Sequence, residues 1–225
     1  EPPAPVTEPE KTFEEVLDEH SVSIQVNGQW QTFPNAKAAE EASYEEYKAN
    51  LRRNAKNFRI TDEHLGEGGP KAKFQANVNA IRLLKELEAA GQQASPEQQE
   101  VLSRYVGWGG LSDAFDPEKP AWALEYAQLK ELLTPEEYAA ARSSTLNAHY
   151  TSPTVIQAIY EAVDRMGFET GNILEPSMGV GNFFGMLPEK MRNSRLYGVE
   201  LDPVSGRIAK QLYPKADITV GGFET

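Results

Sequence analysis

The chain contains no cysteine, and this absence excludes disulfide bonds and metal sites built on thiolates. Histidine is also scarce: His20, His64 and His149 are far apart in the sequence and match none of the spacings that hold a metal ion. A lone histidine usually lies at the surface or packs in a core. We therefore predict that the protein has no metal site.

Long hydrophobic runs are missing as well, because no apolar stretch approaches the roughly 20 residues that cross a membrane. The N-terminal residues 1–5 have neither the basic start nor the apolar core of a secretory signal. Both absences lead us to expect a cytoplasmic protein without a membrane partner. Because the chain also begins without methionine, we interpret it as part of a longer polypeptide.

Basic side chains are outnumbered: there are 22 Lys and Arg against 34 Asp and Glu, which gives a net charge of −12. Taken alone, this charge argues against nucleic-acid binding. The excess of acid lies mainly in residues 1–50, whereas residues 51–85 hold 8 basic side chains against 3 acidic ones. This basic segment either follows the phosphates of DNA, with Lys71 and Lys73 as candidate contacts, or forms a solvated helix face.

The remaining composition is that of a globular protein, with 40% hydrophobic and 25% charged residues. Residues 1–12 are rich in Pro and Glu, and we predict a disordered linker there. Residues 13–56 are predicted to form a small hairpin plus a helix. Apolar residues alternate before Asn27-Gly28, a pair that favours a type I′ turn, and the helix is expected at about residues 36–53.

Residues 57–146 are predicted to be a helical N-terminal region. A glycine-rich loop at residues 66–71 does not match the phosphate-binding P-loop, and an amphipathic helix follows it at residues 74–90. Capping boxes that begin with Ser95 and Thr134 start two further helices. Trp108, in the sequence Gly-Trp-Gly-Gly, is either a lid over a ligand or base, or a core residue beside a turn.

Residues 147–225 alternate in the order α-β-α-β-α-β, which predicts a parallel sheet with helices packed on it. The three strands end near Leu174, Val199 and Val220. The loop after the first strand lies in the sequence NILEPSMGVGNFFG, residues 172–185, and is the centre of the predicted site.

In this loop, Gly179 and Gly181 allow a tight turn with its backbone close to a ligand, and a helix opening at Asn182 would point its first N–H groups at the loop. Glu200 follows at the distance along the chain where a carboxylate binds a ribose. The dinucleotide pattern G-x-G-x-x-G fails, because Phe184 stands where the third glycine belongs. The alternative is a glycine turn that binds nothing.

Glu175 and Pro176 before the two glycines, with Phe183 after them, resemble the S-adenosylmethionine site of amino-group DNA methyltransferases. This cofactor carries an amino group, a carboxylate and a sulfonium, so its binder needs both a carboxylate and free N–H groups. Members of the class have a Tyr-Thr block upstream, and Tyr150-Thr151-Ser152-Pro153 takes that place. Over residues 57–225, the blocks GEGGPKAKF, YVGWGG and AHYTSP more closely resemble the large methylase–helicase proteins of phages and conjugative elements.

The resemblance implies an α/β fold: a partial Rossmann-like S-adenosylmethionine-dependent methyltransferase sheet of three parallel strands, preceded by a helical layer and a small N-terminal β-hairpin. Thr151 and Ser152 would hold the methionine carboxylate, and Glu175 with the two glycines would cradle the rest of the methionine. Glu200 would bind the ribose hydroxyls, and Leu201 would pack on the adenine ring. The implied cofactor-binding residues are Tyr150, Thr151, Ser152, Pro153, Glu175, Pro176, Ser177, Gly179, Gly181, Asn182, Phe183, Glu200, Leu201 and Phe223.

Three departures from the family pattern limit the expected activity. Ser152 separates Thr151 from Pro153, where simpler members have Thr-Pro directly. The third strand is followed by Gly-Gly-Phe-Glu, where many members place an Asp before the Phe to bind the adenine amino group. No tetrapeptide like Asn-Pro-Pro-Tyr or Asn-Pro-Pro-Phe occurs, so the residues that bind a flipped base are missing. We expect these residues to bind the cofactor and to transfer no methyl group.

The predicted function is the S-adenosylmethionine-binding part of a DNA adenine methyltransferase of a mobile element, with DNA and the rest of the parent polypeptide as partners. Two alternatives stay open: a methyltransferase that acts on RNA or protein, and a non-catalytic methyltransferase-like scaffold for nucleic-acid binding. No strand is available to flank residues 173–174 on their other side. We expect that edge to be covered by the parent polypeptide or to pair with a second copy in an edge-to-edge homodimer.

Overall fold

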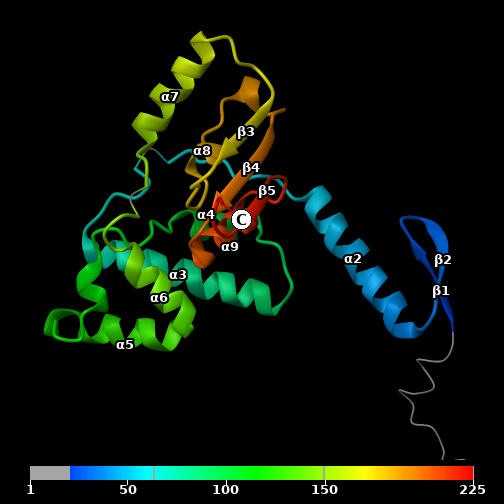
Figure 1. The fold of residues 1–225 in the computed structure, drawn as a ribbon, viewed down its shortest axis with the longest axis horizontal. Coiled ribbons are helices and arrows are strands. Elements are labelled where there is room, and N and C mark those ends of the chain that lie inside the picture. The colour runs from blue at the N-terminus through cyan, green and yellow to red at the C-terminus, as the bar shows by residue number, and fades with distance from the viewer. Residues whose placement is uncertain (1–20, 63, 149, 225) are drawn as a thin grey trace, which may run out of the picture. The chain divides into compact units, whose positions relative to one another are not determined.

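The computed structural model describes residues 21–62, 64–148 and 150–224, without the side chains of residues 47–54. The linker predicted at residues 1–12 lies outside the described residues, as do His20 and His149. The chain divides into two compact units, Glu1–Asn54 and Ala55–Thr225, which Figure 1 colours by residue number. Among the described helices, none is both long and apolar enough to cross a bilayer.

In residues 21–54, the described part of the first unit, the chain forms a β-hairpin followed by a helix (Figure 1). β1 (Val22–Val26) pairs antiparallel with β2 (Gln29–Phe33), and α2 (Ala36–Asn54) follows. Between the strands, Asn27 and Gly28 both have positive φ, 51° and 75°. A type I′ turn requires positive φ at both central residues, so the predicted hairpin and its turn are confirmed.

Four described α-helices open the second unit. They are α3 (Pro70–Ala89), α4 (Pro96–Ser103), α5 (Ala123–Leu132) and α6 (Pro135–Ser144), with the 3-10 turns η1 (Ser112–Phe115) and η2 (Pro120–Trp122) before α5. α3 begins four residues before its predicted start, because Pro70 takes the first helical position, which proline favours, after the N-cap Gly69. Both predicted capping boxes are confirmed, at Ser95 and at Thr134.

Trp108 lies in the aromatic core of these helices. Its side chain is 1% exposed and meets the rings of Phe74, Tyr105 and Phe115 edge-on, with centroids 6.0, 6.3 and 5.3 Å away. T-shaped pairs of this kind are favourable for aromatic rings. The structure therefore corrects the hypothesis that Trp108 is a lid or a nucleic-acid contact: its ring fills the core and has no face left for a base.

A buried amide fixes the turn beside Trp108. Asn77 of α3 is 0% exposed; its Nδ2 donates to the carbonyl of Gly107 at 2.6 Å, and its Oδ1 accepts from the backbone N–H of Val106 at 2.9 Å. Burying an amide is costly unless its hydrogen bonds are made, and here both ends of the amide are used. One side chain of α3 therefore holds both the Val106 N–H and the Gly107 carbonyl.

The rest of the second unit is a parallel sheet with helices. Its elements are α7 (Pro153–Arg165), β3 (Asn172–Glu175), α8 (Asn182–Gly185), the 3-10 turn η3 (Glu189–Met191), β4 (Arg195–Glu200), α9 (Pro203–Leu212) and β5 (Asp217–Val220). The strands pair in the order β3-β4-β5, all parallel, with Glu175 opposite Gly198 and Glu200 opposite Val220. This arrangement confirms the predicted α/β sheet. α8 is only one turn long, because Pro188 disfavours helical backbone at Leu187.

Helix α9 joins the sheet to the helical region. It packs on β4 and β5 and also contacts α3, α4 and α6. Arg207 of α9 forms ion pairs with Glu88 at 2.8 Å and Glu137 at 2.6 Å, and Lys85 pairs with Glu137 at 2.8 Å. The helical region and the sheet are therefore parts of the same compact unit.

Candidate functional site

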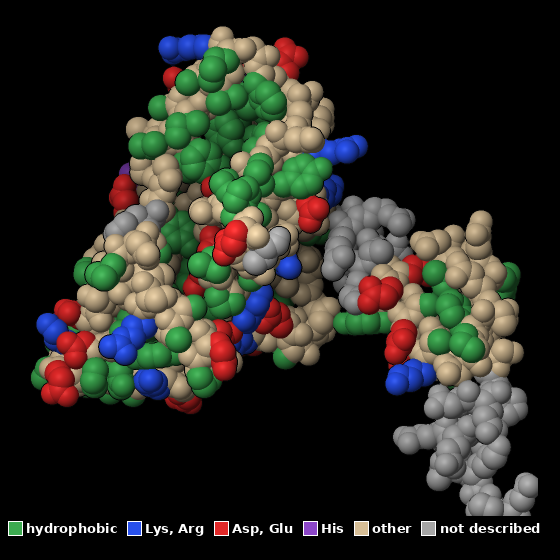
Figure 2. All heavy atoms as spheres, in the orientation of Figure 1, with side chains coloured by type: hydrophobic (Ala, Val, Ile, Leu, Met, Phe, Trp, Pro, Cys, Tyr) green, Lys and Arg blue, Asp and Glu red, His purple; other side chains and the backbone are tan. Residues whose placement is uncertain are grey.

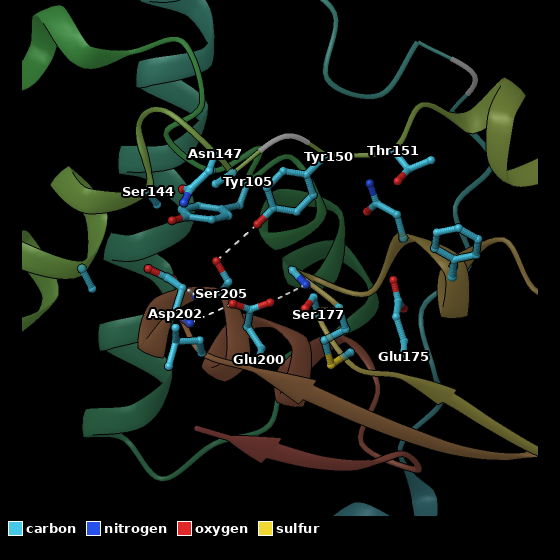
Figure 3. Close-up of a pocket in the computed structure, with 18 of the residues that line it drawn as sticks. Tyr105, Ser144, Asn147, Tyr150, Thr151, Glu175, Ser177, Glu200, Asp202 and Ser205 are labelled. Carbon is cyan, nitrogen blue, oxygen red and sulfur yellow. Dashed lines mark hydrogen bonds between the residues drawn. The ribbon is translucent and has the colours of Figure 1, made fainter. Parts of the chain in front are cut away.

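A cavity of about 620 Å³ lies at the carboxyl ends of β3 and β4. Open parallel sheets bind ligands at this edge, and the volume is in the range of small-molecule and cofactor sites. The lining comes from the loops after β3 and β4, the start of α9, the turn after α4, the second half of α6, and the chain between α6 and α7 (Figure 3). Segments that are far apart in the sequence therefore meet in a single site.

Tyr150 is wedged between two glycine turns at this cavity. Gly107 of the helical region and Gly179 of the loop after β3 have φ of +68° and +56°, and a Cβ added to either would lie 2.6 Å from the Tyr150 ring. The two glycines face opposite edges of the ring, and the ring fits only because neither has a side chain. The Tyr150 hydroxyl lies 3.2 Å from Oγ of Ser205, which tethers the ring to α9.

Glu200, the last residue of β4, is held by two backbone donors. Its Oε2 accepts a 2.6 Å hydrogen bond from the N–H of Gly179, and its Oε1 accepts a 2.8 Å hydrogen bond from the N–H of Asp202. An ionised carboxylate has about four lone-pair sites, so further donors can still bind it. Glu200 therefore fixes the shape of the glycine loop and remains an acceptor toward the cavity that it lines.

Glu175, the last residue of β3, lines the same cavity with an unpaired carboxylate oxygen. Its Oε2 is buried and has no hydrogen-bond partner within the described part of the chain. Burial raises the pKa of Glu175 to about 8, and repulsion from the Glu200 carboxylate adds to the increase. A cationic group in the cavity would supply the missing partner and favour the ionised form.

The other end of the cavity has unpaired polar atoms as well. Asp202 caps α9 with Oδ1, which accepts a 2.7 Å hydrogen bond from the N–H of Ser205, while its Oδ2 is buried without a partner among the described residues. The hydroxyl of Tyr105 is also without a partner in this part of the protein. Figure 3 shows Asp202 at the end of the cavity away from Glu175. Both ends therefore offer polar atoms to a ligand or water.

The structure places nine of the predicted cofactor-binding residues in the lining of this cavity. They are Tyr150, Thr151, Glu175, Ser177, Gly179, Asn182, Phe183, Glu200 and Leu201. Five others lie elsewhere: Ser152 and Pro153 line a neighbouring cavity, and Pro176 lines an apolar cavity beside β3. Gly181 packs beside Tyr213, and Phe223 is 63% exposed and does not line the cavity.

The neighbouring cavity, of about 350 Å³, shares five lining residues with the first one. Its wall includes Lys73, together with Gly66 and Glu67 from the glycine-rich loop before α3. The second glycine-rich loop, residues 107–110, contributes Gly107 to the first cavity and Gly109 to the neighbouring one. One of the two predicted basic contacts and both glycine-rich loops therefore lie beside the site.

Lys71, the other predicted basic contact, is engaged within the protein. Its Nζ donates to the carbonyl of Ala121 at 2.6 Å, pairs with Glu125 at 2.6 Å, and lies 3.9 Å from the ring centroid of Trp122. These contacts join the start of α3 to the start of α5. The side chains of Arg52 and Arg53, from the same basic segment, lie outside the description.

The remaining lining residues were not among the cofactor-binding residues predicted from the sequence. They are Tyr105, Gly107, Ala140, Ser143, Ser144, Asn147, Ala148, Met178, Asp202 and Ser205. Met178 and Asp202 are neighbours of predicted residues along the chain, and this adjacency was a usable signal. The residues from α6 and the turn after α4 reach the cavity because the helical region packs on α9, and no local pattern indicates that.

Comparison with known proteins finds distant relatives. Over 159 residues, or 71% of its length, the chain is 25% identical to the Defense against restriction protein B of Escherichia phage P1, and it covers 6% of that protein. Over 58 residues, or 26% of its length, it is 43% identical to the Type II methyltransferase M.CvrRI of Paramecium bursaria Chlorella virus XZ-6E and covers 15% of it. The chain thus spans a small part of the relatives that it matches. No family model matches the chain, and no solved structure does.

Proposed function

We propose that the cavity at the ends of β3 and β4 binds S-adenosylmethionine, and that the chain is the cofactor-binding part of a DNA adenine methyltransferase. One observation carries the proposal: Glu175, Glu200 and the glycine loop meet in one cavity at the carboxyl ends of adjacent parallel strands. Similarity to a type II methyltransferase supports this cofactor over the other ligands of α/β sheets.

The charges of the cavity fit this cofactor. S-adenosylmethionine carries an ammonium group, and the unpaired Oε2 of Glu175 is a buried acceptor that needs a donor. Thr151, which lines the cavity, would hold the methionine carboxylate. Ser152 lines the neighbouring cavity, so Thr151 would do this without it.

The nucleoside would lie toward the end of β4. Glu200 would accept hydrogen bonds from the ribose hydroxyls with the lone pairs that Gly179 and Asp202 leave free. Leu201 lines the cavity and is 74% exposed, so its side chain is available to an adenine ring. The unpaired Oδ2 of Asp202 lies at the same end, where an exocyclic amino group would satisfy it.

The bound cofactor would supply an electrophilic methyl group, and the residues of this chain would hold and orient it. No Asn-Pro-Pro-aromatic tetrapeptide occurs in the sequence. Alignment of a target amine with the sulfonium needs such acceptors. We therefore propose that methyl transfer requires residues outside this sequence, as part of a longer protein.

Calorimetric titration tests the cofactor assignment. The unaltered chain should bind S-adenosylmethionine and S-adenosylhomocysteine and should not bind NAD. Glu175→Gln should weaken binding of both methionine-bearing ligands about tenfold or more, because a charge-assisted hydrogen bond to the ammonium is lost. Glu161→Gln is the matched control, since Glu161 is an exposed residue of α7 outside the cavity. Absence of binding by the unaltered chain would overturn the assignment and favour the non-catalytic scaffold.

The DNA target has a separate test. The names of the two relatives concern restriction and a type II methyltransferase, which favours DNA over RNA or protein. Lys73→Ala should lower the affinity for duplex DNA and reduce the dependence of this affinity on salt. The control is Lys210→Ala, which removes a charge from α9, away from both cavities. A salt dependence equal to that of the unaltered chain would leave the solvated-face interpretation. Tighter binding to RNA would favour the alternative substrate.

A further inference from the structure

Three consecutive contacts connect helix α3 to the glycine loop of the cavity. Asn77 of α3 holds the turn after α4 through the Gly107 carbonyl at 2.6 Å. Gly107 meets one edge of the Tyr150 ring, and Gly179 meets the opposite edge. Gly179 in turn donates its N–H to Glu200 at 2.6 Å. The path therefore runs from a buried amide in the helical region to the carboxylate at the end of β4.

We propose that Asn77 and Gly107 are positioning residues, which hold the glycine loop in its ligand-binding shape through the ring of Tyr150. The identity of the ligand rests on the proposed function, but the coupling itself does not. Under this proposal the helical region is part of the framework of the binding site. Its folding would be required before the loop after β3 takes its shape.

The ring of Tyr150 is suited to transmit a displacement. It is rigid and planar, and it is confined at both edges by backbone and at its hydroxyl by Ser205 at 3.2 Å. In a close-packed interior, a group that is pushed from one side moves its neighbour on the other side. A shift of the ring toward Gly179 would disturb the hydrogen bond from Gly179 to Glu200, which depends on distance and angle.

Two glycines of the same turn make a matched pair for the test. Gly107 and Gly110 have similar φ, +68° and +74°, so alanine imposes a similar backbone strain at either position. A Cβ at Gly107 would lie 2.6 Å from the Tyr150 ring, whereas a Cβ at Gly110 meets nothing within 4 Å. The difference between the two variants therefore isolates the contact with Tyr150.

The measurement is hydrogen exchange of the Gly179 amide in the ligand-free chain. Gly107→Ala should speed this exchange about tenfold or more, because the hydrogen bond that protects the amide is weakened, and Gly110→Ala should leave it unchanged. In calorimetry, Gly107→Ala should also lower the affinity for S-adenosylhomocysteine about tenfold, whereas Gly110→Ala should leave this affinity close to that of the unaltered chain. Thermal unfolding of both variants shows whether their losses of overall stability match.

A second pair of variants tests the origin of the path. Asn77→Asp keeps the acceptor for Val106 but loses the donor to the Gly107 carbonyl, and it should also speed exchange at Gly179. Asn79→Asp, at an exposed position of the same helix, is its control. This pair decides the question if Gly107→Ala does not fold.

A background without the ring shows whether the effect passes through Tyr150. In the Tyr150→Val chain, adding Gly107→Ala should cause no further change at Gly179. The proposal is overturned if Gly107→Ala and Gly110→Ala change Gly179 exchange equally, or if the effect of Gly107→Ala persists without the ring. Because exchange is measured without ligand, a failure of the cofactor assignment leaves this test intact.

Discussion

The backbone N–H of Gly179 donates a 2.6 Å hydrogen bond to Oε2 of Glu200, which ties the loop after β3 to the end of β4. β3 and β4 are neighbours in the sheet, and both bonded residues line the cavity. The carboxylate that would bind the ribose is thus also the anchor of the loop that would cradle the methionine. Under the proposed function, binding of both halves of the cofactor would depend on this one side chain.

Replacement of Glu200 should therefore affect binding more than the loss of a ribose contact alone. Glu200→Ala is expected to weaken the binding of S-adenosylmethionine by about 1–3 kcal/mol, which is the scale of hydrogen bonds to a charged group. Calorimetric titration against the unaltered chain measures this loss, with Glu161→Ala as the control on α7. Unchanged affinity would remove Glu200 from the site.

The raised pKa of Glu175 predicts that binding of a cationic ligand releases a proton. Burial, with repulsion from Glu200, raises this pKa to about 8, so the carboxyl is mostly neutral at pH 7 in the free protein. An ammonium group beside it favours the ionised form, so binding lowers the pKa and the proton leaves. Affinity should rise from pH 6.5 to 8.

Calorimetry in two buffers of different ionisation enthalpy detects the released proton at pH 7. Glu175→Gln has no carboxyl to titrate, so its binding enthalpy should be nearly independent of the buffer. A proton uptake in the unaltered chain would contradict the prediction, as would the same buffer dependence in Glu175→Gln.

The lowered pKa of Glu137 predicts that the protein loses stability in acid. Burial opposes its charge, but hydrogen bonds from Lys85, the Thr134 N–H and Arg207 outweigh that cost and lower the pKa of Glu137 to about 2. Because this pKa lies below its ordinary value of 4.5, the stabilisation is complete above pH 4.5 and is lost as the pH falls toward 2.

Glu137→Gln keeps a side chain that can complete the capping box of α6, but it removes the charge. Urea unfolding at a series of pH values should show a steeper acid loss for the unaltered chain than for this variant. The exposed neighbour Glu136 gives the control substitution Glu136→Gln, which should leave the acid slope as it is. Equal slopes for Glu137→Gln and the unaltered chain would contradict the role of this ion-pair cluster.

The open edge of the sheet predicts self-association of the isolated chain. In the described structure β3 pairs only with β4, and Leu174 on it is 52% exposed. Val155 and Ile159 of α7 are 49% and 42% exposed, and Figure 2 shows hydrophobic side chains gathered over α7 and β3. An unpaired apolar edge is a template for pairing with another strand, so we expect an edge-to-edge dimer.

Leu174→Lys should make the chain monomeric, because a charge on the edge opposes pairing. Leu124→Lys, at an 84% exposed position of α5, should not change the association. Sedimentation velocity over a range of concentrations separates the outcomes. A clean monomer of the unaltered chain at high concentration would show that another part of the chain shields the edge.

Local signals predicted much of this fold. A type I′ turn requires positive φ at both central residues, and Asn27 and Gly28 are residues that adopt it readily. The capping boxes at Ser95 and Thr134 satisfy backbone N–H groups within one turn of the helix. These features depend only on residues close in the sequence. The parallel sheet followed from the alternation of strands and helices, because such a chain must cross over between neighbouring strands.

The parts of the site that the sequence did not predict depend on contacts between segments that are far apart in the chain. Asn77 reads in the sequence as a polar residue on an amphipathic helix, and its burial becomes understandable only with the Gly107 carbonyl beside it. Tyr105 and Asn147 line the cavity because α3, α4 and α6 pack on α9. No sequence motif predicts this packing. Trp108 was ambiguous for the same reason, since its neighbours decide whether a glycine turn exposes it or buries it.

The position of one tyrosine ring between two glycines couples three positions that are far apart in the sequence, so that the residue allowed at each depends on the other two. An aromatic ring at position 150 keeps both 107 and 179 as glycine, because a Cβ at either would strike it. A smaller residue at 150 would release both positions to asparagine, which tolerates positive φ. Among descendants, these positions should change together or not at all. Recombination that joins the helical region of one lineage to the sheet of another would then succeed only where the ring and both glycines match.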